Sequence, residues 1–557
     1  MLIADAFRLQ TVSEQLPSSI LLQLQIDERL LLQGANKGMT TISPGALSQG
    51  SPVGVVGSGT MGAGIAQVAA LAGHPVVLYD SRTEAVPKAI QGIRQNLEKL
   101  VSKRKLSPEA AESASARLRA ASSLNELRAS GIVIEAVVED LEVKRQLFAE
   151  LEGIVDAKCI LTTNTSSLSV TAIAGVLRAP QRLVGMHFFN PVPLMELVEV
   201  ISGVATDSES LTTIHATAAA WGKTPVYAKS TPGFIVNRVA RPYYGEALLL
   251  LAEQAASPAT IDAVMREAGG FRMGPFELMD LVGLDIGFAV SQSIFGAYFG
   301  DPRYRPSLIQ QEMVRAGFLG RKTKRGFYEY GENALAPVPD TEPPAPRPER
   351  VTLLSAGSLA EALAKRLAES GVIIAREPSR TDHGDSVEVG DAILAVTDGR
   401  SATQRAHETG HRNLVVVDLA LDYLKATRVA IAKASGCDEQ AYLSAVGLLQ
   451  AAGYAVSRLK DVPGIAVMRT VAMLINEAAD AVNQGVATVA DVDTAMRKGV
   501  NYPRGPLAWA DELGIETVQK ALTNLAVHYS GDRYRVSPRI RQLLWSGGTF
   551  YGAKCDR

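Results

Sequence analysis

His187 is the residue whose neighbours most favour acid–base chemistry in this 557-residue sequence. It follows residues 183–186, a predicted strand, and precedes Phe188-Phe189-Asn190-Pro191. An imidazole near its normal pKa can accept the proton of an alcohol while a hydride leaves the same carbon, although a lone histidine is as often structural. Glu196 and Glu199 follow in a segment of alternating polarity, so only one of them should point toward His187 as an orienting carboxylate.

A glycine-rich turn offers a place for a phosphate-bearing cofactor. The predicted strand 53–56 is followed by Gly57-Ser58-Gly59-Thr60-Met61-Gly62 and by an apolar helix predicted over 63–72. Gly57 permits the turn, Gly59 lets a pyrophosphate approach the backbone, and Gly62 allows close packing of helix on strand. This order predicts a dinucleotide site at the N-terminus of the helix.

An acidic residue at the end of the next predicted strand, 76–79, strengthens this prediction. Asp80 lies about 20 residues after Gly57, where a carboxylate binds the ribose hydroxyls of NAD and repels the 2′-phosphate of NADP. Arg82 nearby leaves a strict preference for NAD open. The alternative interpretation is a structural glycine-rich turn with a capping aspartate.

Further polar residues stand at the ends of two more predicted strands, 132–138 and 160–163. Glu139 and a helix bearing Lys144 follow the first strand, and Asn164-Thr165-Ser166-Ser167 follows the second. In a doubly wound sheet, ligands bind beyond the carboxyl ends of the strands. These side chains are therefore expected to face the same site.

A long helical stretch is predicted between Asp80 and Ile132. It carries four basic residues, Lys99, Lys103, Arg104 and Lys105. A solvated charged face and a role in binding phosphate groups are equally compatible with them.

Four ordered motifs resemble those of the L-3-hydroxyacyl-CoA dehydrogenase family. They are the turn with its helix (57–67), Asn164-Thr165-Ser166-Ser167, His187-Phe188-Phe189-Asn190-Pro191 and Thr231-Pro232-Gly233-Phe234-Ile235-Val236-Asn237-Arg238, and the similarity spans roughly residues 53–330. The resemblance implies oxidation of the 3-hydroxyl of an (S)-3-hydroxyacyl-CoA to the 3-oxoacyl-CoA with hydride transfer to NAD. It also implies a place in fatty-acid β-oxidation or phenylacetate catabolism.

The resemblance assigns roles to single residues as well. His187 corresponds to the general base and Glu199 to its orienting carboxylate, while Ser166 and Asn237 correspond to residues that bind the reacting oxygen. Lys103 corresponds to a position that contacts coenzyme A. The other matched positions contact NAD, namely Asp80, Glu139, Lys144, Asn190 and Lys322, together with the turn residues Gly57, Ser58, Gly59, Thr60, Met61 and Gly62.

The second half of the chain repeats the first in degenerate form. At an offset of 231 residues (463 − 232), Pro463-Gly464 aligns with Pro232-Gly233, so the helical part is duplicated. A second offset aligns residues 351–360 with 53–62, but the residues that would hold a dinucleotide are changed: Ser355 replaces Gly57, Ala360 replaces Gly62 and Pro378 replaces Asp80. Met468 also replaces Asn237. We therefore expect one NAD site and one active site per chain, a plan that resembles the longer bacterial members of the family, including 3-hydroxyadipyl-CoA dehydrogenases.

The observations together predict an α/β Rossmann-type dinucleotide-binding domain followed by an all-α domain, with a degenerate second copy of both. The apolar runs of the helical copies exceed what one isolated layer could bury, so the two copies should pack together. Met39 stands shortly before the first strand, which leaves the translation of residues 1–38 open. The predicted segments are a disordered leader (1–50), the NAD-binding domain (51–230), the first helical domain (231–332), a Pro-rich linker (333–350), a truncated Rossmann-like domain (351–461) and the second helical domain (462–557).

Composition argues against several kinds of partner. A net charge of −2 and a charged share of 20% indicate no nucleic-acid surface, and no apolar run is long enough to span a membrane. The three scattered cysteines indicate neither a disulfide framework nor a metal site, and they fit a reducing cytoplasm. A homodimer and a monomer with paired helical domains both remain open.

Two other functions compete with acyl-CoA oxidation. A sugar-acid dehydrogenase of the gulonate type shares the two-domain plan but acts on an unactivated alcohol, and a non-catalytic CoA- or nucleotide-binding protein would have lost its site as the second half has. The intact His187, Glu199, Ser166 and Asn237 argue against the second alternative. The acyl length and a carboxylate at the end of the acyl tail are not fixed by the sequence. The arginines available to meet such a carboxylate are Arg241, Arg266, Arg272 and Arg325.

Overall fold

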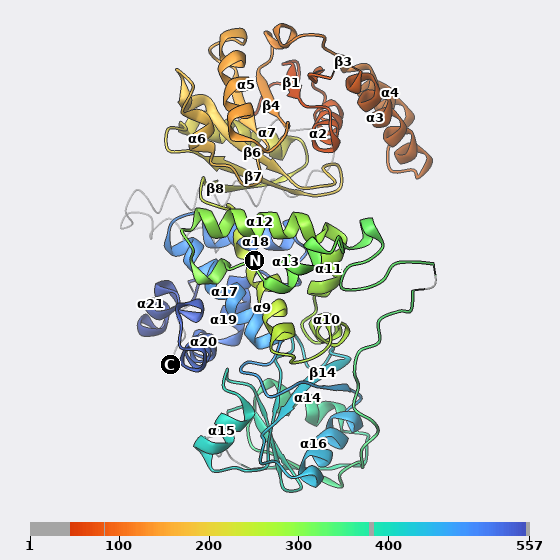
Figure 1. Cartoon of the computed structure of the whole chain (residues 1–557), viewed down its shortest axis with the longest axis vertical. Helices are drawn as coiled ribbons and strands as arrows, with labels where there is room; N and C mark the ends of the chain where they lie inside the picture. Colours follow the sequence, from red (N-terminus) through yellow and green to blue (C-terminus); the bar gives the residue numbers. More distant parts are fainter. Residues whose placement is uncertain (1–44, 83, 333, 378–383, 553–557) are drawn as a thin grey trace, which may run out of the picture. The chain divides into compact units, whose positions relative to one another are not determined.

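The computed structural model describes residues 45–552 apart from residues 83, 333 and 378–383. Most of the predicted leader, residues 1–44, therefore lies outside the described residues, as do Pro378 and Cys555. Residues from Gly45 onward belong to one compact unit that holds both copies of the repeat (Figure 1).

The first sheet has the strand order β3-β2-β1-β4-β5-β6-β7-β8. Neighbouring strands are parallel except β6 and β7, and the chain order reverses between β1 and β4, as in a doubly wound sheet. The strands are β1 (Val53–Val56), β2 (Val76–Tyr79), β3 (Leu118–Ala120), β4 (Ile132–Glu135), β5 (Ile160–Thr163), β6 (Leu183–Phe188), β7 (Leu197–Ser202) and β8 (Thr224–Lys229). The accompanying helices are α2 (Thr60–Leu71), α3 (Ala85–Ser102), α4 (Pro108–Ala116), α5 (Leu141–Ile154), α6 (Val170–Ala174) and α7 (Ser208–Ala220). The predicted Rossmann-type fold is confirmed.

The long helical stretch predicted after Asp80 consists of two helices, α3 and α4, and is followed by strand β3. The chain turns at Arg104, whose φ is +55°, and α4 then begins after Ser107, whose hydroxyl accepts the Ala110 amide. Pro108 favours this new helix start because proline is compatible with a first turn and not with a helix interior. Strand β3 follows and pairs with β2 at the edge of the sheet, which the sequence pattern did not indicate.

Two strand boundaries also differ from the prediction. β4 ends at Glu135 and not at residue 138, because the Val137 amide donates to the Glu135 carboxylate instead of continuing a ladder. β6 continues to Phe188, so His187 lies within the strand and not after it. Pairing with β7 extends β6, since His187 lies directly opposite Glu199.

The helical part is present twice, as predicted. Asp262 accepts the amides of Phe276 and Glu277, and at the 231-residue offset Asp493 accepts those of Leu507 and Ala508. The first copy comprises α8 (Val236–Val239), α9 (Arg241–Ala252), α10 (Pro258–Glu267), α11 (Pro275–Val282), α12 (Leu284–Ala297) and α13 (Leu308–Arg315). The second comprises α17 (Val467–Asn483), α18 (Val489–Gly499), α19 (Pro506–Leu513), α20 (Ile515–Tyr529) and α21 (Pro538–Ser546).

The second sheet has the strand order β10-β9-β11-β12-β13-β14-β15. Its β11 is antiparallel to both neighbours, because β11 and β12 form a hairpin that turns at Gly390, whose φ is +55°. This hairpin replaces the strand and crossover helix found next to β1 in the first sheet. The connection from β10 (ending at Arg376) to β11 (beginning at Ser386) is also far shorter than the segment that carries α3, α4 and β3 in the first copy, and both changes shorten the second copy. The strands are β9 (Arg350–Leu353), β10 (Ile373–Arg376), β11 (Ser386–Val389), β12 (Ala392–Val396), β13 (Leu414–Val417), β14 (Arg428–Lys433) and β15 (Ala455–Arg458), with helices α14 (Ser358–Arg366), α15 (Ala402–Thr409) and α16 (Glu439–Ala451).

The two helical copies pack together through α9 and α17, as Figure 1 shows, and this confirms their predicted pairing. Arg238 Nε donates to Glu477 Oε1 at 2.6 Å, and Arg469 Nε donates to Glu246 Oε2 at 2.7 Å. The same offset of 231 residues relates Arg238 to Arg469 and Glu246 to Glu477. The contact is therefore reciprocal, like the isologous interface of a twofold dimer, but it is made within one chain.

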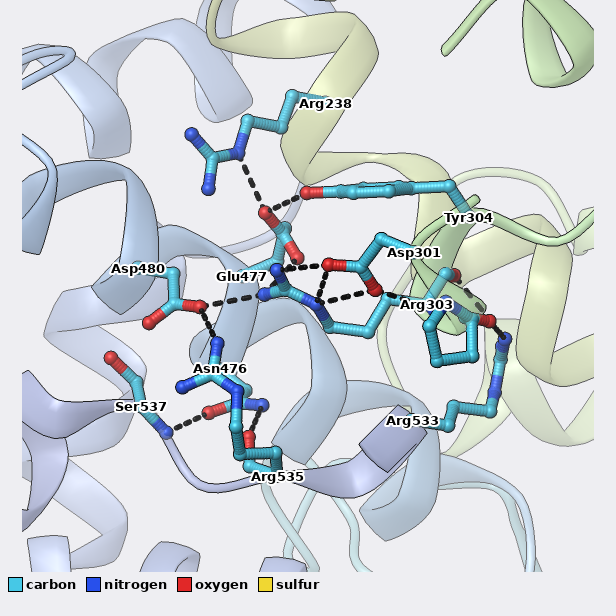
Figure 2. Close-up of polar contacts among 11 residues, drawn as sticks. Arg238, Asp301, Arg303, Tyr304, Asn476, Glu477, Asp480, Arg533, Arg535 and Ser537 are labelled. Carbon is cyan, nitrogen blue, oxygen red and sulfur yellow. Dashed lines mark hydrogen bonds and ion pairs between the residues drawn. The ribbon is translucent and has the colours of Figure 1, made fainter. Parts of the chain in front are cut away.

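Each buried glutamate of this interface gathers several donors from the other side. Figure 2 shows Glu477 accepting from Arg238, Arg303 and Tyr304. Glu246 accepts in the same way from Arg469, Arg533 and Tyr534. Burial by itself raises the pKa of the Glu246 carboxyl, but the charges of Arg533 and Arg469 outweigh this effect and lower the pKa below its ordinary value.

The exchange between copies extends to the sheets. Helix α18 of the second copy contacts β7 and β8 of the first sheet, and α10 of the first copy contacts β14 of the second sheet. The Lys229 amide donates to the Val486 carbonyl at 2.9 Å, and the Lys460 amide donates to the Ala255 carbonyl at 2.9 Å. Each sheet thus rests partly on helices of the opposite copy.

Removing the charge of Glu477 tests the energetic importance of this interface. Glu477→Gln leaves the buried Arg238 without its carboxylate and removes one of the three carboxylates that contact Arg303, so we expect it to destabilise the fold by about 3–5 kcal/mol. The exposed Glu196–Lys498 pair is a control, because Glu196→Gln should cost less than about 1 kcal/mol. Urea unfolding followed by circular dichroism measures the free energy of unfolding of both variants. Equal losses of this free energy would show that Glu477 stabilises the fold no more than an exposed ion pair does.

Candidate active site

His187 and Glu199 face each other on the antiparallel strands β6 and β7. Nδ1 of His187 lies 2.7 Å from Oε2 of Glu199, and both side chains are buried. With Nδ1 donating to the carboxylate, Nε2 is the ring nitrogen that is free to accept a proton. Glu196 lies before β7, is exposed and pairs with Lys498, so the prediction that only one of the two glutamates faces His187 is confirmed.

The second oxygen of Glu199 ties the sheet to the helical domain. Oε1 accepts the amide of Ile235 at 2.9 Å and that of Val236 at 3.0 Å, at the start of α8. One fully buried carboxylate therefore orients the imidazole and binds backbone donors that would otherwise be unpaired. The position of His187 is thus fixed relative to α8, which carries Asn237.

A cavity of about 920 Å³ opens in front of His187. It is lined by five of the predicted site residues besides His187, which are Met61, Glu139, Ser166, Asn190 and Asn237. The side-chain nitrogen Nδ2 of Asn237 lies 3.4 Å from the backbone carbonyl oxygen of Ser166, so the sheet and the helical domain meet at this point. The ring of Phe189 packs against His187 at 4.5 Å between centroids, which excludes water from one side of the imidazole.

Glu139 organises the loop after β5. Its Oε1 accepts the amides of Ser166 and Ser167 at 2.9 and 3.0 Å and the hydroxyl of Thr165 at 2.7 Å. Burial by itself raises the pKa of Glu139, but the charge of Lys144 and these donors lower it below its ordinary value. Glu139 is therefore ionised and holds Ser166 in place.

Lys144 supports Glu139 from beneath the surface. Its side chain is 1% exposed, and its ammonium donates to Glu135 at 2.5 Å and lies 3.3 Å from Oε2 of Glu139. Glu135 was not recognised from the sequence, although an acidic residue inside an otherwise apolar strand was a signal for it. Lys144 therefore acts on the site through Glu139.

The glycine-rich turn has room for an anion. Gly57 has a φ of +102°, a side chain at Gly62 would overlap the Gly57 carbonyl, and a side chain at Gly59 would meet open space. The N-terminus of α2 has no side-chain cap, so its first amides are available to a phosphate group. Ser58 donates its amide and hydroxyl to Asp80 at 2.8 and 2.7 Å, which locks the turn to the end of β2.

The Asp80 carboxyl is ionised in this arrangement. Burial raises its pKa, but the Ser58 and Arg82 amides and the Ser58 hydroxyl outweigh burial and lower the pKa below its ordinary value. The charge at the end of β2 suits ribose hydroxyls and opposes a 2′-phosphate. The turn therefore fits NAD.

The corresponding turn of the second copy is occupied by the chain itself. Asp385 accepts the amides of Leu359 and Ala360 at 2.7 and 3.2 Å at the N-terminus of α14, and Ser355 also hydrogen-bonds it. A carboxylate thus takes the place that a phosphate takes on α2. This agrees with the expectation of a single NAD site, although the occupying residue could not be identified from the sequence.

The histidine–glutamate pair is also altered in the second copy. At the 231-residue offset, Asp418 replaces His187 and Ala430 replaces Glu199. Asp418 accepts the amides of Ala466 and Val467 at 2.9 and 2.7 Å, the counterparts of Ile235 and Val236. Burial raises the pKa of Asp418 to about 6. The carboxylate that binds the helix is retained while the imidazole is lost.

A second cavity, of about 520 Å³, lies between α3 and the glycine-rich turn. Lys99 and Lys103 line it together with Ser58, Gly59, Thr60 and Asn190. Lys322 lines neither cavity and instead donates to Asp285 at 2.5 and 2.7 Å beside Gly283, which lines the large cavity. The structure thus brings Lys103 to a ligand-sized space and leaves Lys322 at the rim.

A phosphate-binding turn and a proton acceptor on one doubly wound sheet are typical of nucleotide-dependent oxidoreductases. Sequence profiles of the 3-hydroxyacyl-CoA dehydrogenase family match the chain: the NAD binding domain at residues 52–231 and the C-terminal domain at 233–330 and again at 464–549. The profile of the 3-hydroxybutyryl-CoA dehydrogenase reduced Rossmann-fold domain matches residues 394–463. The chain belongs to the 3-hydroxyacyl-CoA dehydrogenase family, and it is an NAD-dependent enzyme that oxidises 3-hydroxyacyl-CoA.

Individual relatives extend the comparison. The 3-hydroxyadipyl-CoA dehydrogenase of Escherichia coli K12 is 44% identical over 498 residues, which cover 89% of this chain and 98% of the relative. The 3-hydroxybutyryl-CoA dehydrogenase of Bradyrhizobium diazoefficiens is 42% identical over 287 residues, or 52% of this chain and 97% of the relative. A crystal structure of 3-hydroxybutyryl-CoA dehydrogenase from E. coli K12 has a TM-score of 0.81 and 43% identity, and the match covers 90% of this chain and 100% of that one.

The described residues also bear on metal sites and membrane spans. No group of three or more His, Cys, Asp or Glu side chains among them could hold a metal ion. Among the same residues no single helix is long and apolar enough to cross a membrane. Helices α11 and α12 reach that length and apolar composition only together, and they are bent by 98° relative to each other.

Two matched substitutions test the structural role of the buried carboxylates. Glu199→Ala and Asp418→Ala each leave buried backbone amides unpaired, so each should lower the free energy of unfolding by about 2–4 kcal/mol. Asp207→Ala, which removes an ordinary helix cap, should cost only about 1 kcal/mol. Thermal unfolding of the variants compares them, and a cost for Glu199→Ala no larger than that of the cap would contradict the assigned role.

Proposed function

We propose that His187 is the general base that removes the proton of the substrate's 3-hydroxyl. The observation that carries this proposal is the 2.7 Å contact with Glu199, which leaves Nε2 of His187 facing the cavity as a proton acceptor. Glu199 stabilises the imidazolium that forms. In the reverse direction the same imidazolium returns the proton to the 3-oxo oxygen.

Ser166 and Asn237 hold the reacting oxygen. Both line the cavity with His187, and the loop of Ser166 is fixed by Glu139. Donors positioned before the reaction stabilise developing charge on this oxygen without reorganisation. They therefore orient C3 of the substrate so that its hydride faces the nicotinamide.

NAD, when bound, accepts the hydride that leaves C3. We assign its pyrophosphate to the Gly57–Gly62 turn and its adenosine ribose to Asp80, on the strength of the open N-terminus of α2. Asn190 borders both cavities and is assigned to the cofactor, as is Lys322 at the rim. Lys144 acts through Glu139.

Coenzyme A is assigned to the second cavity. Lys103 and Lys99 supply positive charge there for its phosphate groups. Because Asn190 lines both cavities, a thioester anchored there can reach His187. Relatives named for 3-hydroxyadipyl-CoA and 3-hydroxybutyryl-CoA favour a thioester over the free sugar acid of the gulonate-type alternative.

A cytoplasmic location is part of the proposal. It rests on the cysteines, because Cys159 and Cys437 are both free and buried. Burial raises the pKa of the Cys159 thiol to about 12, so this thiol is unreactive near neutral pH.

Replacing the proposed base should separate chemistry from binding. His187→Gln is expected to lower kcat with acetoacetyl-CoA and NADH by on the order of a hundredfold or more while NADH binding stays intact. His215→Gln, at a histidine that stacks on Tyr227 outside the two described cavities, is the matched control and should retain turnover. Turnover like that of the unmodified enzyme in His187→Gln would exclude His187 as the base, and activity with gulonate-type ketones but not with acetoacetyl-CoA would exclude the thioester substrate.

The charge of Asp80 is expected to decide cofactor choice. Asp80→Ser removes the repulsion of a 2′-phosphate, so the ratio of kcat/KM for NADPH to that for NADH should rise at least about tenfold. Steady-state rates with acetoacetyl-CoA and each cofactor measure the ratio. An unchanged ratio would show that Asp80 does not meet the ribose.

A further inference from the structure

The cavity in front of His187 is bordered by several arginines, most of which are already paired. Arg303 contacts Asp301, Glu477 and Asp480. Arg469 and Arg533 both contact Glu246, and Arg469 also contacts Glu253, so carboxylates of the first helical copy neutralise these arginines of the second copy. These arginines hold the two copies together and are not available to a ligand.

Arg241 is different, because no carboxylate of the described residues pairs with it. Its Nε donates to the Asn237 carbonyl at 2.8 Å, and Nη1 has only a long contact of 3.4 Å with the Ser291 hydroxyl. The guanidinium lies over the ring of Tyr244 at 4.9 Å. Burial lowers the pKa of Arg241, and only the nearby tyrosines Tyr244 and Tyr502 oppose this effect.

A half-buried guanidinium without a counter-ion is energetically costly, and an anion bound beside it would remove much of that cost. Arg241 lines the same cavity as His187, Ser166 and Asn237. Its planar fork matches the two oxygens of a carboxylate. The geometry therefore favours a ligand that brings a carboxylate into this cavity.

The positions of Asn237 and Arg241 in the chain indicate how far this carboxylate lies from the reacting carbon. Arg241 follows Asn237 by four positions across the junction of α8 and α9, and its Nε donates to the Asn237 carbonyl at 2.8 Å. The two side chains are therefore neighbours, about 6 Å apart. In a 3-hydroxyadipyl chain, two methylene groups separate C3 from the terminal carboxylate. A chain of this length spans the gap when Asn237 holds the oxygen on C3.

We propose that Arg241 binds the terminal carboxylate of a dicarboxylic acyl chain and so selects dicarboxylyl-CoA substrates. This inference rests on the proposed function, since it takes the position of C3 from His187 and Asn237. Arg305, which lines the cavity and is exposed, has no carboxylate partner among the described residues and is a second positive charge at the same cavity. The phosphates of coenzyme A are a separate source of negative charge, but they belong with Lys99 and Lys103 in the other cavity.

A pair of substrates of equal chain length tests the proposal. 3-Oxoadipyl-CoA and 3-oxohexanoyl-CoA differ at the terminal carbon, where one has a carboxylate and the other a methyl group. With NADH, the unmodified enzyme should have the higher kcat/KM for 3-oxoadipyl-CoA. Arg241→Leu should lower the ratio of the two kcat/KM values by about 10- to 100-fold, and Arg241→Lys by less, because lysine keeps the charge but not the fork.

Controls separate this proposal from the general function. Arg272→Leu removes an exposed arginine that lines neither described cavity and should leave the ratio unchanged. A preference of the unmodified enzyme for 3-oxohexanoyl-CoA, or an equal loss with both substrates in Arg241→Leu, would overturn the role of Arg241 while leaving the acyl-CoA function intact. If neither thioester is turned over by the unmodified enzyme, the proposed function itself fails. Should Arg241→Leu not fold, the substrate ratios of the unmodified enzyme and of Arg241→Lys still decide the question.

Discussion

The whole arrangement depends on one buried carboxylate that accepts hydrogen bonds from two directions. Glu199 binds the His187 imidazole with one oxygen and the first amides of α8 with the other. A charge in the interior is tolerated only when it is fully hydrogen-bonded, so neither the strand nor the helix can shift without cost. The imidazole, the loop of Ser166 and the side chain of Asn237 are consequently held around one cavity. The second copy keeps the carboxylate–helix contact through Asp418 and has lost the chemistry, which separates the structural part of the interaction from the catalytic part.

Packing explains why the chain keeps a second half whose own dinucleotide site is closed. Its dinucleotide turn is closed by Asp385, and its sheet has a hairpin in place of a crossover. Its helices nevertheless cover surfaces that the first half cannot cover alone, since α18 lies against β7 and β8, the strands next to the active site. The reciprocal pairs Arg238–Glu477 and Arg469–Glu246 have the symmetry of a contact between identical subunits. Selection for this interface can preserve a copy whose own site is gone.

Much of the fold and site was accessible from local sequence signals. The strand–turn–helix of residues 53–71, the strand 160–163 and the duplication of the helical part were predicted because glycine spacing, short apolar runs and repeated motifs are local patterns. Strand β3 and the β11–β12 hairpin were missed, because edge strands and antiparallel insertions depend on tertiary pairing. The roles of Glu135 and Asp385 were missed because they depend on contacts that only the fold creates. Glu135 contacts Lys144 and Thr163, and Asp385 contacts the N-terminus of α14. The catalytic roles of His187, Glu199, Ser166 and Asn237 and the cofactor and CoA contacts remain predictions.

The large cavity is not built by the first half of the chain alone. Part of its wall comes from the second half of the chain, through Arg469, Tyr529, Arg533 and Tyr534. The same Arg469 and Arg533 pair with Glu246, so the contact that joins the two copies also shapes the space in front of His187. The duplication has therefore made a copy with a closed dinucleotide turn and no histidine–glutamate pair a structural part of the other copy's cavity.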